Sequence, residues 1–298
     1  KAAALVSPGT PKVHYQLNTS SVDETHYEML KRLELSKQAH LDLAAYCQVL
    51  EIDFISTPYD IQSAGFLAEM GVHFFKTASA DLVDLPLQRF IAATGKPAII
   101  ATGMATLGEV ELVVNIYSEE GNSNAVLLHA VSNYPCSDES LNLRVMHTLA
   151  KAFSLPVGFS DHSKGYLGAV LSIAMGAKVI EKHFTLDKSM AGPDHKASLD
   201  PVELKDMVIG IRNIEEAMGS FQKEIQGSEA PVFKKLAKSI VSAVDITSGI
   251  PITIEMLTTK GPGTGISPMR INEIIGKTSI RDIAKDQIIK ENDIQWTT

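Results

Sequence analysis

The stretch PVGFSDHSKGYLGAVLSIAMGAKVIEKHFTLDKSMAGP, residues 156–193, decides how the rest of the chain is interpreted. It predicts a short apolar strand that ends at His162, a helix rich in small residues, and a second apolar strand that ends at His183. If the two strands are parallel neighbours, both imidazoles leave the sheet at the same edge, where α/β enzymes place their chemistry. The stretch therefore predicts a site built on two strand-end histidines.

Outward from this stretch, short apolar runs alternate with helical segments. Strands are predicted at residues 53–57, 73–79, 97–102, 125–131, 157–160 and 178–183, and helices at residues 24–33, 36–50, 64–70, 85–93, 107–119, 141–153 and 201–218. Residues 1–23 are expected to form an irregular loop. This alternation predicts a parallel sheet covered on both faces. An open doubly wound sheet and a (β/α)8 barrel lacking two units both fit. The strand ends carry scattered hydroxyl, lysine and histidine side chains and no G-x-G-x-x-G sequence, which favours the barrel.

Composition limits the class of protein and its partners. The 298 residues are 45% hydrophobic and 21% charged, which is typical of a soluble globular chain. A net charge of −8 without a basic block argues against a nucleic-acid partner, and no apolar run reaches the length of a membrane span. Two cysteines, Cys47 and Cys136, give no disulfide framework. These features predict a cytoplasmic protein with neither a nucleic-acid nor a membrane partner.

The carboxyl-terminal part of the chain differs from the rest. The α/β alternation ends near residue 221, a polar linker is expected at 222–236, and residues 237–298 carry short strand-like runs. Residues 244–257 match residues 281–294, sharing an Asp-Ile pair, a central Ile and a closing Leu or Ile. We therefore expect a barrel domain at 1–221 and a small β-rich domain at 237–298 with pseudo-two-fold symmetry.

The two strand-end histidines are candidate metal ligands. Neutral imidazole binds Mn, Zn or Fe, and a site with only two histidines leaves positions open for water or substrate oxygens. Alternate residues of a strand share a face, so Ser160 points with His162, and Glu181 points with His183. Glu181 is a candidate third ligand or orienting group. The alternative is that the two histidines are unrelated and one is packed in the core.

Lys76 lies inside an apolar strand, HFFKTAS, where an unpaired ammonium is costly. It needs an anion, or it must lose its proton. The first reading makes Lys76 an anchor for phosphate or carboxylate. The second makes it a Schiff-base amine. A lysine that extends its charge out to solvent at the strand end is the structural alternative.

Small hydroxyl residues mark the same sheet edge. They are Thr57, Ser79, Thr102 and Ser160 at strand ends and Ser132 just beyond another strand. Each alone is commonly a turn former, but together they suit the oxygens of a phosphate. Two loops beyond the strands, at Tyr134 and Asp194, carry side chains that could orient a polyol.

Seven segments in this order carry a family resemblance: FISTPYD, FFKTAS, IIATGMAT, LLHAVSNYP, GFSDHSKG, IEKHFTLD and GPDH. They closely resemble the N-acetylneuraminate synthase family, which includes legionaminate, pseudaminate and spore-coat polysaccharide synthases. The resemblance covers nearly the whole chain, and residues 237–298 resemble the family's antifreeze-like SAF domain. It implies a (β/α)8 TIM barrel whose first two strands are absent from this chain, a β-clip SAF domain, and a domain-swapped homodimer.

The resemblance also implies an activity. Phosphoenolpyruvate (PEP) would condense with an N-acylated hexosamine of the N-acetylmannosamine type, giving a nine-carbon nonulosonic acid and phosphate, with Mn²⁺ or Mg²⁺ as cofactor. In that picture His162 and His183 match metal ligands, Thr57, Lys76, Ser79, Ser132 and Ser160 match PEP contacts, and Asp81, Tyr134 and Asp194 match sugar contacts. Tyr134, Glu181 and Asp194 are the catalytic candidates. The family's acid/base glutamate belongs to the strands that this chain does not show.

The chain departs from the family's pattern at two positions. Ala101 stands where many members have serine, and Gly261 stands where bacterial members have an arginine that reaches the partner's sugar. Arg270 is the candidate replacement. Two other functions are considered: a Schiff-base aldolase using Lys76, and a non-enzymatic carbohydrate- or ice-binding module.

Overall fold

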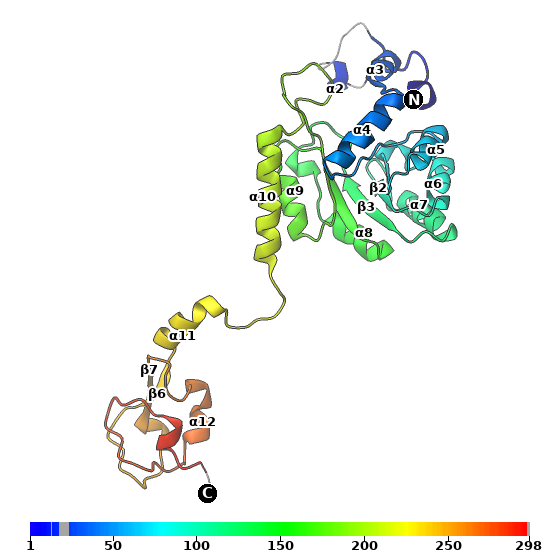
Figure 1. Cartoon of the computed structure of the whole chain (residues 1–298). Coiled ribbons are helices and arrows are strands. Elements are labelled where there is room, and N and C mark those ends of the chain that lie inside the picture. Colours follow the sequence, from blue (N-terminus) through cyan, green and yellow to red (C-terminus); the bar gives the residue numbers. More distant parts are fainter. Residues whose placement is uncertain (13, 18–23, 297–298) are drawn as a thin grey trace. The chain divides into compact units, whose positions relative to one another are not determined.

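The computed structural model describes residues 1–12, 14–17 and 24–296 (Figure 1). It divides into two compact units, Lys1–Gly219 and Ser220–Thr298, and each is described by itself. The first unit contains α1 (Ala2–Leu5), α2 (His14–Leu17), α3 (His26–Leu33), α4 (Lys37–Val49), α5 (Ile61–Glu69), β1 (Phe75–Thr77), α6 (Leu85–Ala93), β2 (Ala98–Ala101), α7 (Leu107–Glu119), β3 (Ala125–Ala130), α8 (Val145–Phe153), β4 (Val157–Asp161), α9 (Leu167–Ala174), β5 (Ile180–Lys182) and α10 (Pro201–Met218).

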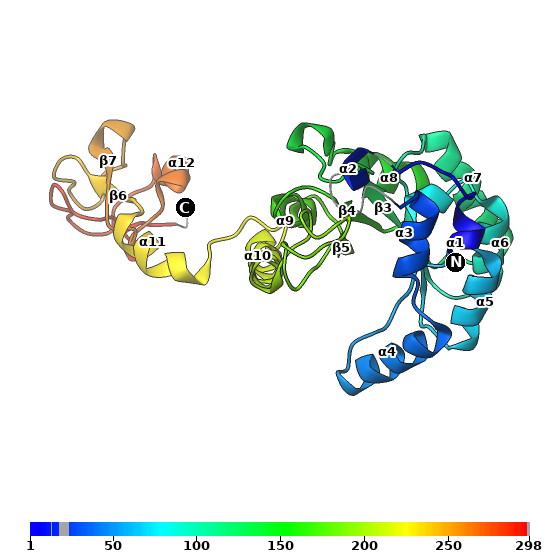
Figure 2. The ribbon, with the colours of Figure 1, turned by 90° about the horizontal axis from the view of Figure 1, so that it is seen from above.

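The five strands of the first unit form one parallel sheet in the order β1-β2-β3-β4-β5. Each strand joins the next along the chain, so the order never reverses as it does in a doubly wound sheet. An α-helix follows every strand, and Figures 1 and 2 show α6, α7 and α8 beside the sheet. This is part of a (β/α)8 barrel, as the sequence predicts.

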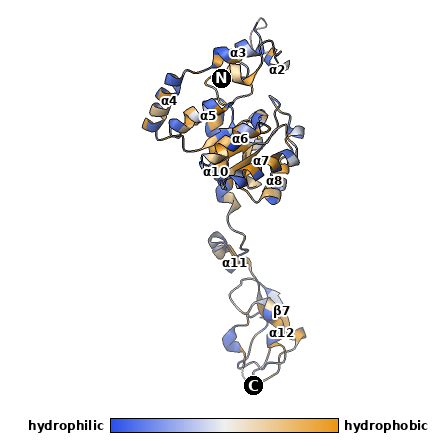
Figure 3. Ribbon diagram, turned by 90° about the vertical axis from the view of Figure 1, so that its right-hand side faces the viewer, coloured by the Kyte–Doolittle hydropathy of each residue, from blue (hydrophilic) through white to orange (hydrophobic). Residues whose placement is uncertain are grey.

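The core of this unit lies between the sheet and its helices. Leu127 on β3 and Phe159 on β4 have no exposed surface, and they pack with Val113 of α7 and Met146 of α8 in one hydrophobic cluster. In Figure 3 the hydrophobic residues gather around the sheet between α6, α7 and α8. Burial of these apolar side chains on the helix-facing side of the strands holds the strand ends at fixed positions.

Two local predictions are wrong. Residues 53–57 are extended but form no strand, because they have no ladder partner among the described residues, and Ile55 is 37% exposed. Residues 1–23 are not simply a loop, since 2–5 and 14–17 are helical. Alanine is the best helix former, and the run of three at 2–4 favours α1, where Ala2 is buried. The rest of that predicted loop, residues 13 and 18–23, lies outside the described residues.

The second unit contains α11 (Ala230–Leu236), β6 (Ser239–Ser242), β7 (Leu257–Lys260) and α12 (Ile271–Ile274). The predicted repeat is visible in its hydrogen bonds. Ile246 and Ile283, which correspond in the repeat, each donate a backbone N–H to the other's carbonyl at 2.8 Å. Ser248 N–H donates to Asp282 Oδ1 at 2.7 Å, and its repeat equivalent, Lys285 N–H, donates to Asp245 Oδ1 at 2.7 Å. These reciprocal pairs confirm the pseudo-two-fold symmetry.

Candidate functional site

The two predicted histidines lie together at the carboxyl ends of neighbouring strands. In the β4–β5 ladder Ser160 pairs with Glu181 and Asp161 with Lys182. His162 and His183 follow directly, and their ring centroids are 5.4 Å apart. The parallel register therefore places both imidazoles at one edge, as their spacing in the sequence predicts.

Hydrogen bonding fixes the orientation of His162. Its Nδ1 lies 2.8 Å from the carbonyl oxygen of Val131, so Nδ1 carries the proton and donates it. The Nε2 lone pair then faces the site, 3.5 Å from Ser160 Oγ. Burial lowers the pKa of His162 and favours the neutral imidazole, and the Val131 carbonyl opposes that effect. Neutral imidazole with an unprotonated Nε2 is the form that binds metals.

Tyr134 and Asp194 close around the same pair. The Tyr134 ring centroid lies 4.2 Å from that of His162 and 5.5 Å from that of His183. Asp194 Oδ2 is 3.9 Å from His183 Nδ1, which is beyond hydrogen-bond length. The structure thus brings both loop residues to the histidines, although the two loops lie far apart in the sequence.

Lys76 has the anion that its buried position requires. Its Nζ lies 2.9 Å from Glu181 Oε1, and the lysine side chain is only 17% exposed. The contact joins the first strand of the sheet to the fifth. An ammonium held by a carboxylate suits an anion-binding site, whereas a Schiff base needs the free amine.

Two of the predicted hydroxyls converge on Gly103, which follows β2. Its N–H donates to Ser79 Oγ at 3.0 Å. A Cβ at this position would lie 2.6 Å from Ser132 Oγ and 2.7 Å from Ser79 Oγ, so only glycine fits between them. Thr102, by contrast, donates its hydroxyl to the Leu128 carbonyl and serves the backbone.

Asp81 is buried and follows Ser79 by two residues. Burial, followed by the charge of Asp84, raises its pKa to about 6, and the Lys76 charge opposes the shift. Burial and then the charges of Asp81, Glu181 and Asp194 raise the pKa of Tyr59. The Tyr59 phenol therefore lies within electrostatic reach of three carboxylates of the site.

Several oxygens here are buried without a hydrogen-bond partner in the described part of the chain. They are Asp81 Oδ2, Ser132 Oγ, Glu181 Oε2 and Asp194 Oδ1. Buried polar atoms are normally satisfied, so a group of unsatisfied acceptors indicates a place for a ligand that donates hydrogen bonds. Sugar hydroxyls, amides and water have such donors.

A divalent metal at this site would need ligands besides the two imidazoles, such as water or substrate oxygens. Among the described residues no three His, Cys, Asp or Glu side chains gather as a metal-binding group, so Glu181 does not join the two histidines as a third ligand. The orientation of His162 and the unsatisfied acceptors nearby do suit a metal held by two imidazoles. Water or substrate would then complete its coordination.

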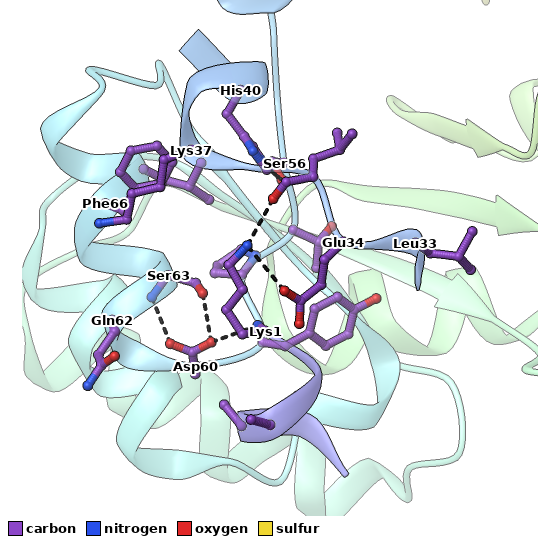
Figure 4. A pocket seen from close by; sticks show the side chains of 17 residues that line it. Lys1, Leu33, Glu34, Lys37, His40, Ser56, Asp60, Gln62, Ser63 and Phe66 are labelled. Carbon is purple, nitrogen blue, oxygen red and sulfur yellow. Dashed lines mark hydrogen bonds and ion pairs between the residues drawn. The ribbon is translucent and has the colours of Figure 1, made fainter. Parts of the chain in front are cut away.

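Thr57, predicted as a PEP contact, lies two residues before Tyr59, and its role stays a prediction. It lines a pocket of about 570 Å³, between the start of the chain, α4 and α5, that is drawn in Figure 4. There His40 Nε2 lies 3.3 Å from Ser56 Oγ, and the Lys37 ammonium lies over the Phe66 ring at 4.9 Å. Tyr59 also lines this pocket, and because the charges of Asp81, Glu181 and Asp194 act on its phenol, the pocket lies next to the strand-end cluster.

Arg270, the candidate replacement for the arginine absent at Gly261, is engaged elsewhere in the second unit. Its guanidinium pairs with Glu273 at 2.8 Å and with Glu291, and it lies 5.2 Å from the Trp296 ring. These contacts hold the side chain within its own unit. The substitution at Gly261 therefore has no visible compensation in Arg270.

Sequence reasoning missed five residues that contribute to the site. Gly103 was signalled by its position after a strand, and the pair Asp161 and Lys182 by matching places before the two histidines. Tyr59 lies in the segment FISTPYD, but its nearness to the carboxylates is visible only in the folded chain. The Val131 carbonyl is a backbone group, which no side-chain motif reports.

Within the described residues, no helix combines the length and hydrophobicity that a membrane crossing requires.

Comparison with known proteins places this geometry in a family. The chain matches the NeuB family over residues 1–223 and the SAF domain over residues 237–295. It is 42% identical to N,N'-diacetyllegionaminic acid synthase of Campylobacter jejuni over 98% of this chain and 88% of that protein. It is 43% identical to the enzyme of the same name from Legionella pneumophila over 93% of this chain and 79% of that protein.

A solved structure agrees with these relatives. The N-acetylneuraminic acid synthetase of Leptospira borgpetersenii superposes with a TM-score of 0.66 at 34% identity, covering 69% of this chain and 72% of that one. The relatives therefore share both sequence and fold with this chain. The chain belongs to the NeuB family and carries a carboxyl-terminal SAF domain.

Proposed function

We propose that the protein condenses phosphoenolpyruvate with an open-chain N-acylated hexosamine to give a nonulosonic acid and phosphate. The observation that carries the proposal is the convergence at one sheet edge of Lys76 with the two imidazoles of His162 and His183. A cation for the phosphorylated substrate thus lies near the two imidazoles that would receive the sugar aldehyde. The names of the relatives, which make legionaminic and N-acetylneuraminic acids, support the same reaction class.

In this proposal the anionic substrate replaces Glu181 as the partner of Lys76. PEP carries both a phosphate and a carboxylate, and an ammonium is a strong partner for either. The proposed contacts are Thr57, Lys76, Ser79, Ser132 and Ser160, and Thr57 lines the pocket that also contains Tyr59. Their hydroxyls donate to phosphate oxygens while the lysine charge offsets the charge that builds up as phosphate leaves.

The sugar would bind through the acceptors that now lack partners. Asp81 and Asp194 are placed to accept hydrogen bonds from its hydroxyls, and Tyr134 covers the histidine rings. Once Lys76 turns to PEP, the Glu181 carboxylate is free to hold or accept a proton. Tyr134, Glu181 and Asp194 are therefore the residues proposed for catalysis.

His162 and His183 would hold the divalent metal, Mn²⁺ or Mg²⁺. When bound, such an ion polarises a carbonyl oxygen and so activates the sugar aldehyde toward addition. The chain's own contribution is to favour the neutral form of His162 by burial, which lowers its pKa, and to present its Nε2, since the Val131 carbonyl holds the proton at Nδ1.

The proposal extends to the whole molecule. We expect a barrel domain at 1–221, a linker at 222–236 and a SAF domain at 237–298, in a cytoplasmic homodimer whose SAF domains cover the partners' barrels. Limited proteolysis would test the linker, and sedimentation equilibrium would test the dimer. A protein that is monomeric at micromolar concentration would contradict the expected domain-swapped dimer.

A metal and borohydride experiment separates the proposed reaction from its runner-up. The runner-up is a Schiff-base aldolase that uses Lys76. For the synthase, chelation of divalent metal abolishes turnover, Mn²⁺ restores it, and borohydride traps no adduct with a keto acid. Full activity after chelation, or a borohydride adduct on Lys76, would favour the aldolase. In a non-enzymatic binding module, replacement of His162 by alanine would leave ligand binding intact.

A further inference from the structure

A buried ion pair lies directly beneath the two histidines. Asp161, the last residue of β4, faces Lys182, the last residue of β5, across the ladder. Lys182 Nζ lies 3.1 Å from Asp161 Oδ2, and the two side chains are 2% and 0% exposed. Each partner immediately precedes one of the imidazole residues.

Both charged groups also bind the backbone just beyond His162. Ser163 N–H donates to Asp161 Oδ1 at 2.8 Å, and Lys182 Nζ donates to the Ser163 carbonyl at 2.5 Å. Cys136 N–H donates to the His162 carbonyl at 2.8 Å. The peptide groups around His162 are therefore held to β5 and to the loop after β3 at the same time.

Stability alone does not account for this pair. The cost of removing two charges from water offsets most of their mutual attraction, so apolar residues of similar volume serve a fold as well or better. What the pair supplies is a fixed register and a fixed direction of approach between two strand ends. That geometry fixes the backbone from which the side chains of His162 and His183 extend, while the Val131 carbonyl orients the His162 ring itself.

We propose that Asp161 and Lys182 are positioning residues that set the separation and orientation of His162 and His183. The inference rests on the proposed function, because the two imidazoles are taken there as the holders of a divalent metal. Groups that orient metal ligands from behind typically change metal affinity 10–100-fold when they are removed. Neither Asp161 nor Lys182 needs to touch the metal or the substrates.

The deciding variant replaces both partners with uncharged residues, Asp161→Asn with Lys182→Met. The double change leaves no lone buried charge, so the fold is retained, whereas each single change leaves one charge without its partner. Arg89→Met is the matched control, since Arg89 forms ion pairs with Glu119 and Glu120 on the surface. Circular dichroism confirms folding before any binding is measured.

Two readouts test the inference on the full chain. Free Mn²⁺, followed by electron paramagnetic resonance without substrates, gives the dissociation constant. Imidazole ¹⁵N chemical shifts of metal-free protein report the tautomer and hydrogen bonding of His162 and His183. We expect a folded double variant with a Mn²⁺ dissociation constant raised roughly 10–100-fold and altered imidazole shifts, while the Arg89 variant resembles the wild type.

The outcomes distinguish the inference from the proposed function. A folded double variant with wild-type Mn²⁺ affinity and unchanged shifts overturns the positioning role and leaves the proposed function standing. Wild-type protein that binds no Mn²⁺, with imidazole shifts that still change in the double variant, refutes the metal in the proposed function and keeps the positioning role.

Discussion

Replacement of Asp81 by asparagine should stabilise the barrel unit at neutral and alkaline pH and have less effect in acid. Asp81 is 6% exposed, its Oδ2 has no hydrogen-bond partner among the described residues, and burial raises its pKa from the ordinary 3.8 to about 6. The native state therefore binds this proton more tightly than the unfolded chain does. The stability that protonation supplies is present in acid and is lost as the pH rises through about 6.

The size of the effect follows from the two pKa values. The step from 3.8 to about 6 corresponds to ~3 kcal/mol of unfolding free energy. Between about pH 4.5 and about pH 8 the difference between wild type and Asp81→Asn should grow by roughly 2 kcal/mol, because at the lower pH part of the cost is already relieved. Asparagine keeps the shape and stays neutral throughout.

Denaturant unfolding at the two pH values measures this difference. Far-ultraviolet circular dichroism follows the first unit, where most of the helices lie, and fluorescence of the single tryptophan, Trp296, follows the second unit as an internal control. An Asp81→Asn variant that is no more stable than wild type at about pH 8, or whose advantage does not depend on pH, would refute the reasoning. A change in the Trp296 transition would show that the effect is not local to Asp81.

Three further predictions concern the PEP site, the SAF domain and the sugar. Lys76→Met should raise the KM for PEP in steady-state kinetics roughly 10–100-fold, because it removes a hydrogen bond to a charged group. The control Lys151→Met, at an exposed lysine, should leave this KM unchanged. Ile246→Ala, at the centre of the pseudo-two-fold unit, should destabilise that unit by ~2–5 kcal/mol in tryptophan-monitored unfolding, whereas the half-exposed Ile280→Ala changes it by less than ~1 kcal/mol. Gly261→Arg should fold normally, since a Cβ there meets its nearest neighbours at 3.5 Å, and should alter the relative KM values of N-acyl sugars; an unchanged sugar preference would count against a role for this position.

The sequence predicts those parts of the fold that depend on local pattern. The spacing of the two histidines, one strand–helix unit apart, places both imidazoles at one edge because parallel strands bring their carboxyl ends together. The internal repeat predicts the symmetry of the SAF domain, since equivalent segments form equivalent hydrogen bonds. Apolar periodicity and glycine stops give the bounds of α6, α7 and α10 to the residue.

What depends on partners distant in the chain could not be predicted. The run at residues 53–57 has strand composition, but a strand exists only where a neighbour completes its ladder. The anion for Lys76 was expected, yet only the closing of the sheet identifies it as Glu181. Tyr59 comes near the site carboxylates through tertiary packing, and the pocket that it shares with Thr57 forms only where α4 and α5 meet the start of the chain.

Phosphate release is the most direct test of the proposed reaction. Protein produced from the complete reading frame is incubated with PEP, Mn²⁺ and a panel of N-acetylmannosamine, 2,4-diacetamido and 6-deoxy sugars, and both phosphate and the 2-keto acid are quantified. We predict that at least one sugar gives phosphate and a nine-carbon 2-keto acid in equal amounts, and that His162→Ala abolishes both. No phosphate from any sugar, or phosphate without the nine-carbon acid, would contradict the account.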